Sequence, residues 1–239
     1  MAYKLRYKED DVVEVGLDEA GRGCLFGRLY VGAVVFSNDA DADFFDNGAT
    51  LNKIKDSKLL TKRQRACLFD YVNECALDKT VAYAEAAEVD TLNVLQADLT
   101  TMHRALDSLT VPVERVLVDG DHWRPYKDTE GYAIVDGDAQ YLAIAAAGIL
   151  AKVSRDAWVS EIVATHPEWD AQYGLGKNMG YGTAIHMEGL KKHGATIEHR
   201  RSFRPVAEAL GLPTKPKFER KKKGVAAAAK SGWEGVKED

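Results

Sequence analysis

Cysteine, proline and long apolar runs are all scarce in this sequence of 239 residues. The three cysteines (Cys24, Cys67 and Cys75) are odd in number and form no CxxC pair, which argues against a disulfide framework or a zinc knuckle and indicates a reducing compartment. Six prolines are too few for an extended, disordered chain. The longest apolar run, 141–151, is too short to span a bilayer, and the first residues lack the apolar segment of a targeting signal. We therefore expect a cytoplasmic protein with a packed core and no membrane partner.

The charge is unevenly distributed along the chain. The formal net charge is −5, yet residues 171–230 contain thirteen Lys or Arg and four Asp or Glu, a net of +9, so the remainder carries −14. This asymmetry suggests a basic surface for a polyanion beside an acidic part whose carboxylates could hold cations. A solvated basic tail explains the same charges without any partner.

The pattern of apolar residues predicts alternating strands and helices. A capping box at Thr61 and Gln64 starts one helix, an apolar stripe from Leu92 to Leu106 marks another, and an alanine-rich run predicts a buried helix over 139–153, with Gly148 allowing a close backbone approach. A further helix is expected to begin within 181–193, and an exposed loop over 37–55. The strands are predicted over 12–18, 29–36, 80–85, 115–120 and 132–135, the first two as an antiparallel pair. The expected fold class is α/β.

Four acidic residues stand at the ends of predicted elements. Asp18 lies on the face of its strand opposite the apolar residues, and Glu19 would point away from it unless the glycine-containing segment that follows lets the chain bend. Asp119 ends another apolar strand, and Asp138 precedes the alanine-rich helix. Carboxylate oxygens are the ligands of Mg²⁺ in phosphoryl chemistry. Taken singly, however, Asp138 could be a plain N-cap and Asp119 part of a turn.

Other candidate residues give weaker signals. Gly21-Arg22-Gly23 could expose backbone N–H groups to a phosphate or sugar, but it could also be a tight turn with a surface arginine. Tyr181 stands between two glycines, where its ring could stack on a sugar or base, although ordinary packing is commoner. The histidines form no metal-binding spacing, and Ser57 has no paired histidine, which disfavours covalent catalysis.

Eight segments, in the same order along the chain, resemble the motifs of the type 2 ribonuclease H family, specifically its bacterial-style ribonuclease HII branch. The resemblance covers roughly residues 12–206. The segments are GLDEAGRG (16–23), KDSKLLT (55–61), residues 90–106, LVDG (117–120), GDA (137–139), AGILAKVSRD (147–156), GYGT (180–183) and HRRSF (199–203).

The resemblance implies an RNase H-like fold, with a five-stranded mixed sheet flanked by helices and a C-terminal helical extension. The implied organisation is a lead over 1–11, a catalytic domain over 12–212 whose helical part begins at about 167, and a basic, flexible tail over 213–239. Two Mg²⁺ or Mn²⁺ ions would be held, together with substrate, by four acids. By motif position these acids are Asp18, Glu19, Asp119 and Asp138.

The resemblance also implies the substrate contacts. Gly21, Arg22, Gly23 and Tyr181 correspond to the family's sensor of the 2′-hydroxyl at an RNA-to-DNA junction, and Lys58 to a phosphate contact. The implied activity is that of a monomeric endoribonuclease, a metal-dependent hydrolase. It would cut the RNA strand of RNA/DNA hybrids and duplex DNA on the 5′ side of embedded ribonucleotides, as ribonucleotide excision requires.

The sequence departs from the family pattern at four positions. Cys24 and Arg28 stand where prolines are common, Gly148 replaces a serine, and Asp136 replaces a lysine. Because Asp136 adds a fifth acid near the others, it should favour metal uptake and weaken phosphate approach. Asp136 and the basic C-terminal third also motivate an alternative, a catalytically silent hybrid-binding protein. A second alternative is ribonuclease HIII, which carries a large extra N-terminal domain, whereas about a dozen residues precede the first strand here.

Overall fold

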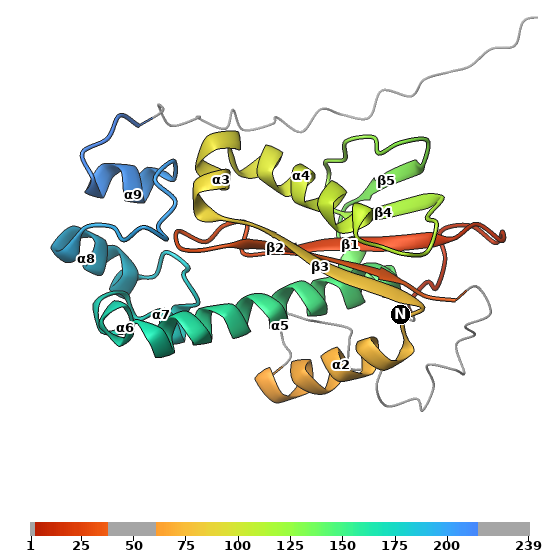
Figure 1. Cartoon of the computed structure of the whole chain (residues 1–239), viewed down its shortest axis with the longest axis horizontal. Coiled ribbons are helices and arrows are strands. Elements are labelled where there is room, and N and C mark those ends of the chain that lie inside the picture. Colours follow the sequence, from red (N-terminus) through yellow and green to blue (C-terminus); the bar gives the residue numbers. More distant parts are fainter. Residues whose placement is uncertain (1–2, 38–60, 215–239) are drawn as a thin grey trace, which may run out of the picture.

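A five-stranded mixed sheet forms the centre of the protein (Figure 1), as seen in a computed structural model that describes residues 3–37 and 61–214. The strand order is β3-β2-β1-β4-β5, in which β2 is antiparallel to both its neighbours and β4 is parallel to both of its own. The predicted α/β fold is confirmed, whereas nearly all of the predicted loop over 37–55 lies outside the described residues. The strands are β1 (Glu14–Ala20), β2 (Leu29–Val35), β3 (Asp78–Ala84), β4 (Arg115–Asp119) and β5 (Glu130–Ile134).

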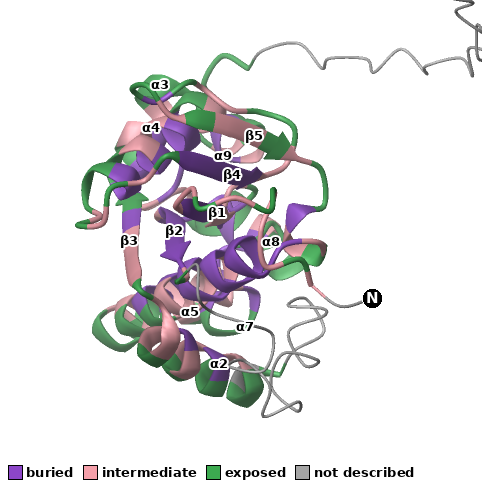
Figure 2. Ribbon diagram, turned by 90° about the vertical axis from the view of Figure 1, so that its right-hand side faces the viewer, coloured by how far each residue is buried: buried purple, intermediate pink, exposed green. Residues whose placement is uncertain are grey.

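Helices cover both faces of the sheet. The 24-residue helix α5 (Leu142–Thr165) packs across β1 and β2 on one face, and α2 (Lys62–Cys75) packs on the outer side of α5. On the other face α4 (Val94–Asp107) packs against β2 and β3, with α3 (Ala86–Leu92) before it. Figure 2 shows that burial is concentrated in the central strands and in the side of α5 that faces them.

The helix boundaries confirm some predictions and correct others. The capping box at Thr61 is present, since its side chain accepts from the Gln64 N–H and the Gln64 side chain accepts from the Thr61 N–H. The stripe from Leu92 to Leu106, however, spans two helices. The break falls at Asn93, whose φ is +68°. Its side chain caps α4 by accepting hydrogen bonds from the N–H groups of Leu95 and Gln96. Leu92 thus ends α3 and is 36% exposed, so it does not belong to the core stripe.

The predicted helical extension is confirmed, and Figure 1 places it at one end of the sheet. The helix expected from Tyr181 starts later, at Ala184, because Thr183 is its N-cap.

The alanine-rich helix also starts later than predicted, at Leu142, and a separate 3₁₀ turn, η1 (Gly137–Ala139), precedes it. None of the described helices combines the length and apolar character needed to cross a membrane. The division into lead, domain and tail stays a prediction, and residues 215–239 lie outside the described part. The extension comprises α6 (Pro167–Tyr173), α7 (Leu175–Asn178), α8 (Ala184–His193) and α9 (Arg204–Ala209).

Two strand glycines let α5 approach the sheet at backbone distance. A Cβ added to Gly16 in β1 would lie 2.2 Å from the carbonyl carbon of Ala143, and one added to Gly32 in β2 would lie 2.2 Å from the carbonyl oxygen of Ala147. Backbone atoms cannot move aside as a flexible side chain can, so these positions exclude any larger residue. The close packing fixes where the first turns of α5 cross the middle of β1 and β2.

We expect Gly16→Ala to lower the free energy of unfolding by at least about 2 kcal/mol, because the added methyl group overpacks the contact between β1 and α5. Urea denaturation followed by circular dichroism measures this change. Gly23→Ala is the matched control, since a Cβ there has no atom within 4 Å. A Gly16→Ala protein as stable as the control would contradict the close approach.

Candidate active site

A pocket of about 460 Å³ lies at the carboxyl ends of β1 and β4. Because these two strands run parallel, their carboxyl ends meet at the same edge of the sheet. The pocket brings together all four of the predicted carboxylates and the predicted sugar-contacting residues. Its lining consists of Asp18, Glu19, Ala20, Gly21, Arg22, Gly23, Arg65, Asp119, Asp138, Gly148, Ile149, Lys152 and Tyr181.

Asp18 faces α5, on the side of β1 opposite the apolar residues, as predicted. Its Oδ1 accepts a hydrogen bond of 2.7 Å from the Glu19 N–H, and its Oδ2 would lie 2.2 Å from a Cβ added to Gly148. Gly148 therefore permits a close approach by the side chain of Asp18, and not the backbone approach that was predicted. Burial raises the pKa of Asp18 well above its usual value, and the charges of Glu19 and Asp119 raise it further. The ionised form of this carboxylate is therefore disfavoured in the pocket.

Glu19 points to the opposite face of β1, toward α4. Arg22 Nη1 lies 3.4 Å from Glu19 Oε1 and 3.6 Å from Asp98 Oδ2, so one cation stands between two acids. Burial raises the pKa of Glu19, while Arg22 opposes this shift. The bend expected between Asp18 and Glu19 is absent, because β1 stays paired with β2 through Ala20. The Asp18 and Glu19 side chains both line the pocket because it lies at the carboxyl end of β1, where it is open to both faces of the sheet.

Asp119 and Asp138 lie side by side on the other half of the pocket. Asp119 is the last residue of β4, and its Oδ1 accepts a 3.2 Å hydrogen bond from the Asp138 N–H in η1. The N-cap of α5 is Tyr141, so the interpretation of Asp138 as a plain N-cap is wrong. Both carboxylates help to raise the pKa of Asp18, which shows that the charges interact across the pocket.

The set of donor atoms suits a hard divalent cation. Four carboxylates offer only oxygen ligands, which Mg²⁺ and Mn²⁺ prefer. The raised pKa values of Asp18 and Glu19 mark negative charges that burial and neighbouring acids destabilise and that a cation would stabilise. Within residues 3–37 and 61–214, no three His, Cys, Asp or Glu side chains are arranged closely enough to hold an ion without adjustment. The residues therefore fit the group in chemistry, and their side chains must draw together to ligate it.

The Gly21-Arg22-Gly23 turn is held from behind by a buried arginine. Arg200 is fully buried, and its Nη1 donates to the carbonyl oxygens of Gly21 at 2.8 Å and Arg22 at 3.1 Å. In a trans peptide the N–H points opposite the C=O, so the N–H groups of Arg22 and Gly23 point away from Arg200. This orientation suits an acceptor oxygen on the pocket side of the turn.

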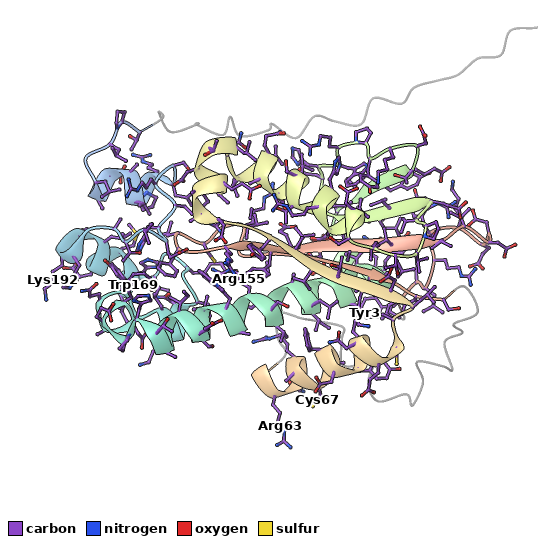
Figure 3. All side chains as sticks on the ribbon, in the orientation of Figure 1. Tyr3, Arg63, Cys67, Arg155, Trp169 and Lys192 are labelled. Carbon is purple, nitrogen blue, oxygen red and sulfur yellow. The ribbon has the colours of Figure 1, made fainter. Side chains whose placement is uncertain are left out.

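A second buried arginine connects this turn to the segment that carries Tyr181. Arg155 projects from α5 toward the sheet (Figure 3), and its guanidinium donates to the carbonyls of Phe26 at 3.1 Å, Arg28 at 3.1 Å and Met179 at 2.8 Å. A Cβ on Gly21, whose φ is +87°, would lie 2.1 Å from Arg155 Nε. This glycine is therefore needed to accommodate the guanidinium as well as for the turn.

Tyr181 lies in the loop between α7 and α8, with 44% of the residue exposed. Lys152 Nζ is 5.9 Å from the centre of its ring, and both residues line the pocket. The interpretation of Tyr181 as ordinary core packing is therefore wrong, since the ring is accessible from the pocket.

A chain of two buried histidines fixes the backbone at Tyr181. His186 Nδ1 lies 3.0 Å from the Tyr181 carbonyl oxygen, and His186 Nε2 lies 3.0 Å from His199 Nε2. The Thr196 N–H donates to His199 Nδ1 at 3.0 Å. The assignment that satisfies all three contacts has two neutral rings, in which His199 Nε2–H donates to His186 Nε2 and His186 Nδ1–H donates to Tyr181. Burial lowers the pKa of both rings, that of His199 to about 3.

Some residues considered from the sequence either lie outside the described residues, so that their predictions stay untested, or do not line the pocket. Lys58 and Ser57 lie outside the described residues. Asp136 is exposed and does not line the pocket, and Asp156 pairs with Lys152 at 2.7 Å.

The sequence reasoning missed three residues of this region. Arg65 and Lys152 line the pocket from α2 and α5, and Asp98 is a buried acid on α4 beside Arg22. The signal for Asp98 was an acid between Ala97 and Leu99, both of which belong to the buried face of that helix.

Comparisons with known proteins agree with this geometry. The family model for ribonuclease HII matches residues 15–206. A ribonuclease HII of Paracidovorax citrulli is 45% identical over 195 residues, which cover 82% of this chain and 75% of that protein. The ribonuclease H2 of Pyrococcus horikoshii OT3 superimposes with a TM-score of 0.66 at 25% identity, over 83% of this chain and 97% of that one. Bst-RNase HIII in complex with Mn²⁺ shares the fold, with a TM-score of 0.60 at 17% identity over 86% and 71% of the two chains. The RNase H-like fold is thereby confirmed.

The histidine pair predicts a pH dependence of stability. A histidine whose pKa is lowered by folding contributes stability above its unfolded pKa of about 6.5, and this contribution is lost as the pH falls. For His199, whose folded pKa is about 3, the loss between pH 7.5 and pH 5 is ~2 kcal/mol. We expect His199→Gln to remove this part of the pH dependence, as measured by urea denaturation at each pH.

The buried carboxyls Asp18 and Asp98 have raised pKa values, so their contribution to stability is lost as the pH rises, opposite to that of His199. The informative quantity is therefore the difference in unfolding free energy between wild type and variant at each pH. Because both proteins contain these acids, their contributions cancel in the difference. Parallel pH profiles for the two proteins would contradict the neutral histidine pair.

Proposed function

The chain belongs to the ribonuclease HII family, and we propose that it cuts the RNA strand of RNA/DNA hybrids and duplex DNA on the 5′ side of embedded ribonucleotides. As a family member it is a ribonuclease H, a nuclease of the hydrolase class. The observation that carries the finer proposal is that four carboxylates, the Gly21–Gly23 turn and Tyr181 line a single pocket.

Asp18, Glu19, Asp119 and Asp138 would hold Mg²⁺ or Mn²⁺, two ions together with substrate. The presence of Mn²⁺ in the Bst-RNase HIII complex supports this choice of metal. Bound there, the ions would activate a water molecule and stabilise the leaving oxygen of the phosphodiester. The protein orients the ligands, since the Asp138 N–H fixes Asp119 and the Glu19 N–H fixes Asp18. No protein side chain is needed as the base, and the products carry 3′-hydroxyl and 5′-phosphate ends.

The opposite rim of the pocket would recognise the sugar. Only the 2′-hydroxyl distinguishes a ribose from a deoxyribose, and this group both donates and accepts hydrogen bonds. The N–H groups of Arg22 and Gly23, which point away from Arg200, can donate to the hydroxyl, while the Tyr181 ring packs against the sugar. Lys58 would contact a phosphate, and Arg65 and Lys152 add positive charge beside the acids.

The alternatives are less well supported. A silent hybrid-binding protein has no need for four carboxylates in one pocket, where burial and the neighbouring acids raise the pKa of Asp18. Ribonuclease HIII is not the family whose model matches residues 15–206. The monomeric state and the cytoplasmic location stay predictions.

The test of the activity is cleavage of a labelled DNA duplex that contains one ribonucleotide, in the presence of Mg²⁺, with the cut mapped to the nucleotide. Cutting on the 5′ side of the ribonucleotide is expected. Binding of the duplex without cleavage would show that the protein is not an active endoribonuclease.

We expect Asp119→Asn and Asp138→Asn each to lower kcat at least about 100-fold, because each removes a charged ligand of the ions that act in the reaction. The measurement is the cleavage rate at saturating Mg²⁺. Asp136→Asn is the matched control, since this acid is exposed and lies two residues from Asp138 without lining the pocket. Near wild-type cleavage by Asp138→Asn would contradict its assignment as a ligand.

We propose in addition that the Tyr181 hydroxyl bonds to the sugar, and we expect Tyr181→Phe to slow cleavage at a single embedded ribonucleotide by about tenfold, the effect of one lost hydrogen bond. Because the ring is kept, binding of the duplex should change little. Tyr126→Phe is the control, since the Tyr126 hydroxyl bonds to Asp107 away from the pocket. Equal rates for wild type and Tyr181→Phe would leave the hydroxyl without a role.

A further inference from the structure

A buried carboxylate on α4 has no complete set of partners. Asp98 is 1% exposed, and within the described part of the chain its Oδ1 has no hydrogen-bond partner. Its neighbours on the helix, Ala97 and Leu99, belong to the apolar core. An unpaired carboxylate in such surroundings costs several kcal/mol, so burial raises the pKa of Asp98 to about 8, and its ionised form requires a cation.

Arg22 is the cation within reach of Asp98. Its Nη1 lies 3.6 Å from Asp98 Oδ2 and 3.4 Å from Glu19 Oε1, and both distances are longer than those of a close charge-assisted hydrogen bond. The guanidinium therefore stands between two carboxylates without a close bond to either. The Arg22 side chain is 37% exposed, which leaves it room to move, whereas Asp98 is held in the core by α4.

We propose that Asp98 is a positioning residue that draws Arg22 away from Glu19 when Glu19 binds a divalent cation. This inference rests on the proposed function, because it takes Glu19 to be a metal ligand. With Oδ2 already near Nη1 and Oδ1 without a partner, Asp98 can accept two parallel hydrogen bonds from the guanidinium. Arg22 can then move away from Glu19 while its guanidinium stays paired with Asp98.

The role has a consequence for metal affinity. A guanidinium on Glu19 competes with the metal for the same carboxylate. If an uncharged residue replaces Asp98, Arg22 keeps only Glu19 of these two acids. The metal must then displace Arg22 from Glu19 with no second carboxylate to receive the guanidinium, which makes the free energy of metal binding less favourable. An exposed or partly exposed charge pair is worth up to about 1 kcal/mol, which corresponds to about fivefold in affinity.

The experiment is calorimetric titration of the full-length protein with Mn²⁺ in the absence of nucleic acid. Four proteins form a double-mutant cycle: wild type, Asp98→Asn, Arg22→Ala and the double variant. We expect Asp98→Asn to weaken Mn²⁺ binding about fivefold in the wild-type background and to have almost no effect in the Arg22→Ala background. Asp107→Asn, an exposed acid at the end of the same helix, controls for the change in net charge.

The outcomes separate this inference from the proposed function. Equal affinities of wild type and Asp98→Asn overturn the positioning role. An equal loss in both backgrounds also overturns it, since that result assigns the effect to the field of Asp98 and not to Arg22. Should Asp98→Asn fail to fold, Asp98→Ser takes its place in the cycle and is read by the same outcomes. If the wild type does not bind Mn²⁺, or Asp119→Asn binds it equally well, the proposed metal site itself fails.

Discussion

The pocket depends on two buried guanidinium groups that bond to backbone carbonyls. Arg155 and Arg200 are fully buried, and within the described residues neither forms an ion pair. Burial lowers the pKa of Arg200 to about 10, which reflects the cost of holding a cation there. Carbonyl oxygens offset part of this cost. These bonds fix together segments that are far apart in the sequence, namely the connection between β1 and β2 (residues 21–28), Met179 of the helical extension, and α5.

The acids require the opposite kind of support. The parallel pair of β1 and β4 brings Asp18 and Asp119 to one edge of the sheet, and the helix approach allowed by Gly16 confines Asp18 against α5. Burial raises the pKa of Asp18 and of Glu19, and the nearby charge of Asp119 raises both further, so the pocket disfavours the ionised forms of these two acids. A rigid backbone is needed to keep such groups together. The two buried guanidinium groups behind the Gly21–Gly23 turn and the acidic residues of the pocket are thus two parts of one electrostatic arrangement.

Much of this architecture could be predicted because it depends on local patterns. Period-two alternation separated Asp18 from the apolar face of its strand, and the capping box at Thr61 was read correctly. The break at Asn93 could not be found, because the leucine stripe continues through it and only the backbone angle reveals the two helices. Contacts between distant residues, such as the Asp138 N–H with Asp119 or Arg200 with Gly21, depend on tertiary packing, which periodicity does not encode.

Of the departures from the family pattern, Gly148 bears more directly on the reaction than Asp136. Asp136 adopts a left-handed conformation, with φ of +54°, which Asp tolerates better than most residues, and its exposed charge is screened by water and salt. Gly148, in contrast, lies against the carboxylate of Asp18, and a side chain there would press on Oδ2. The glycine therefore gives Asp18 a position set further toward α5 than a serine would allow. If the four acids hold the proposed ions, the space that Gly148 leaves for the Asp18 carboxylate bears on how closely the carboxylates can draw together.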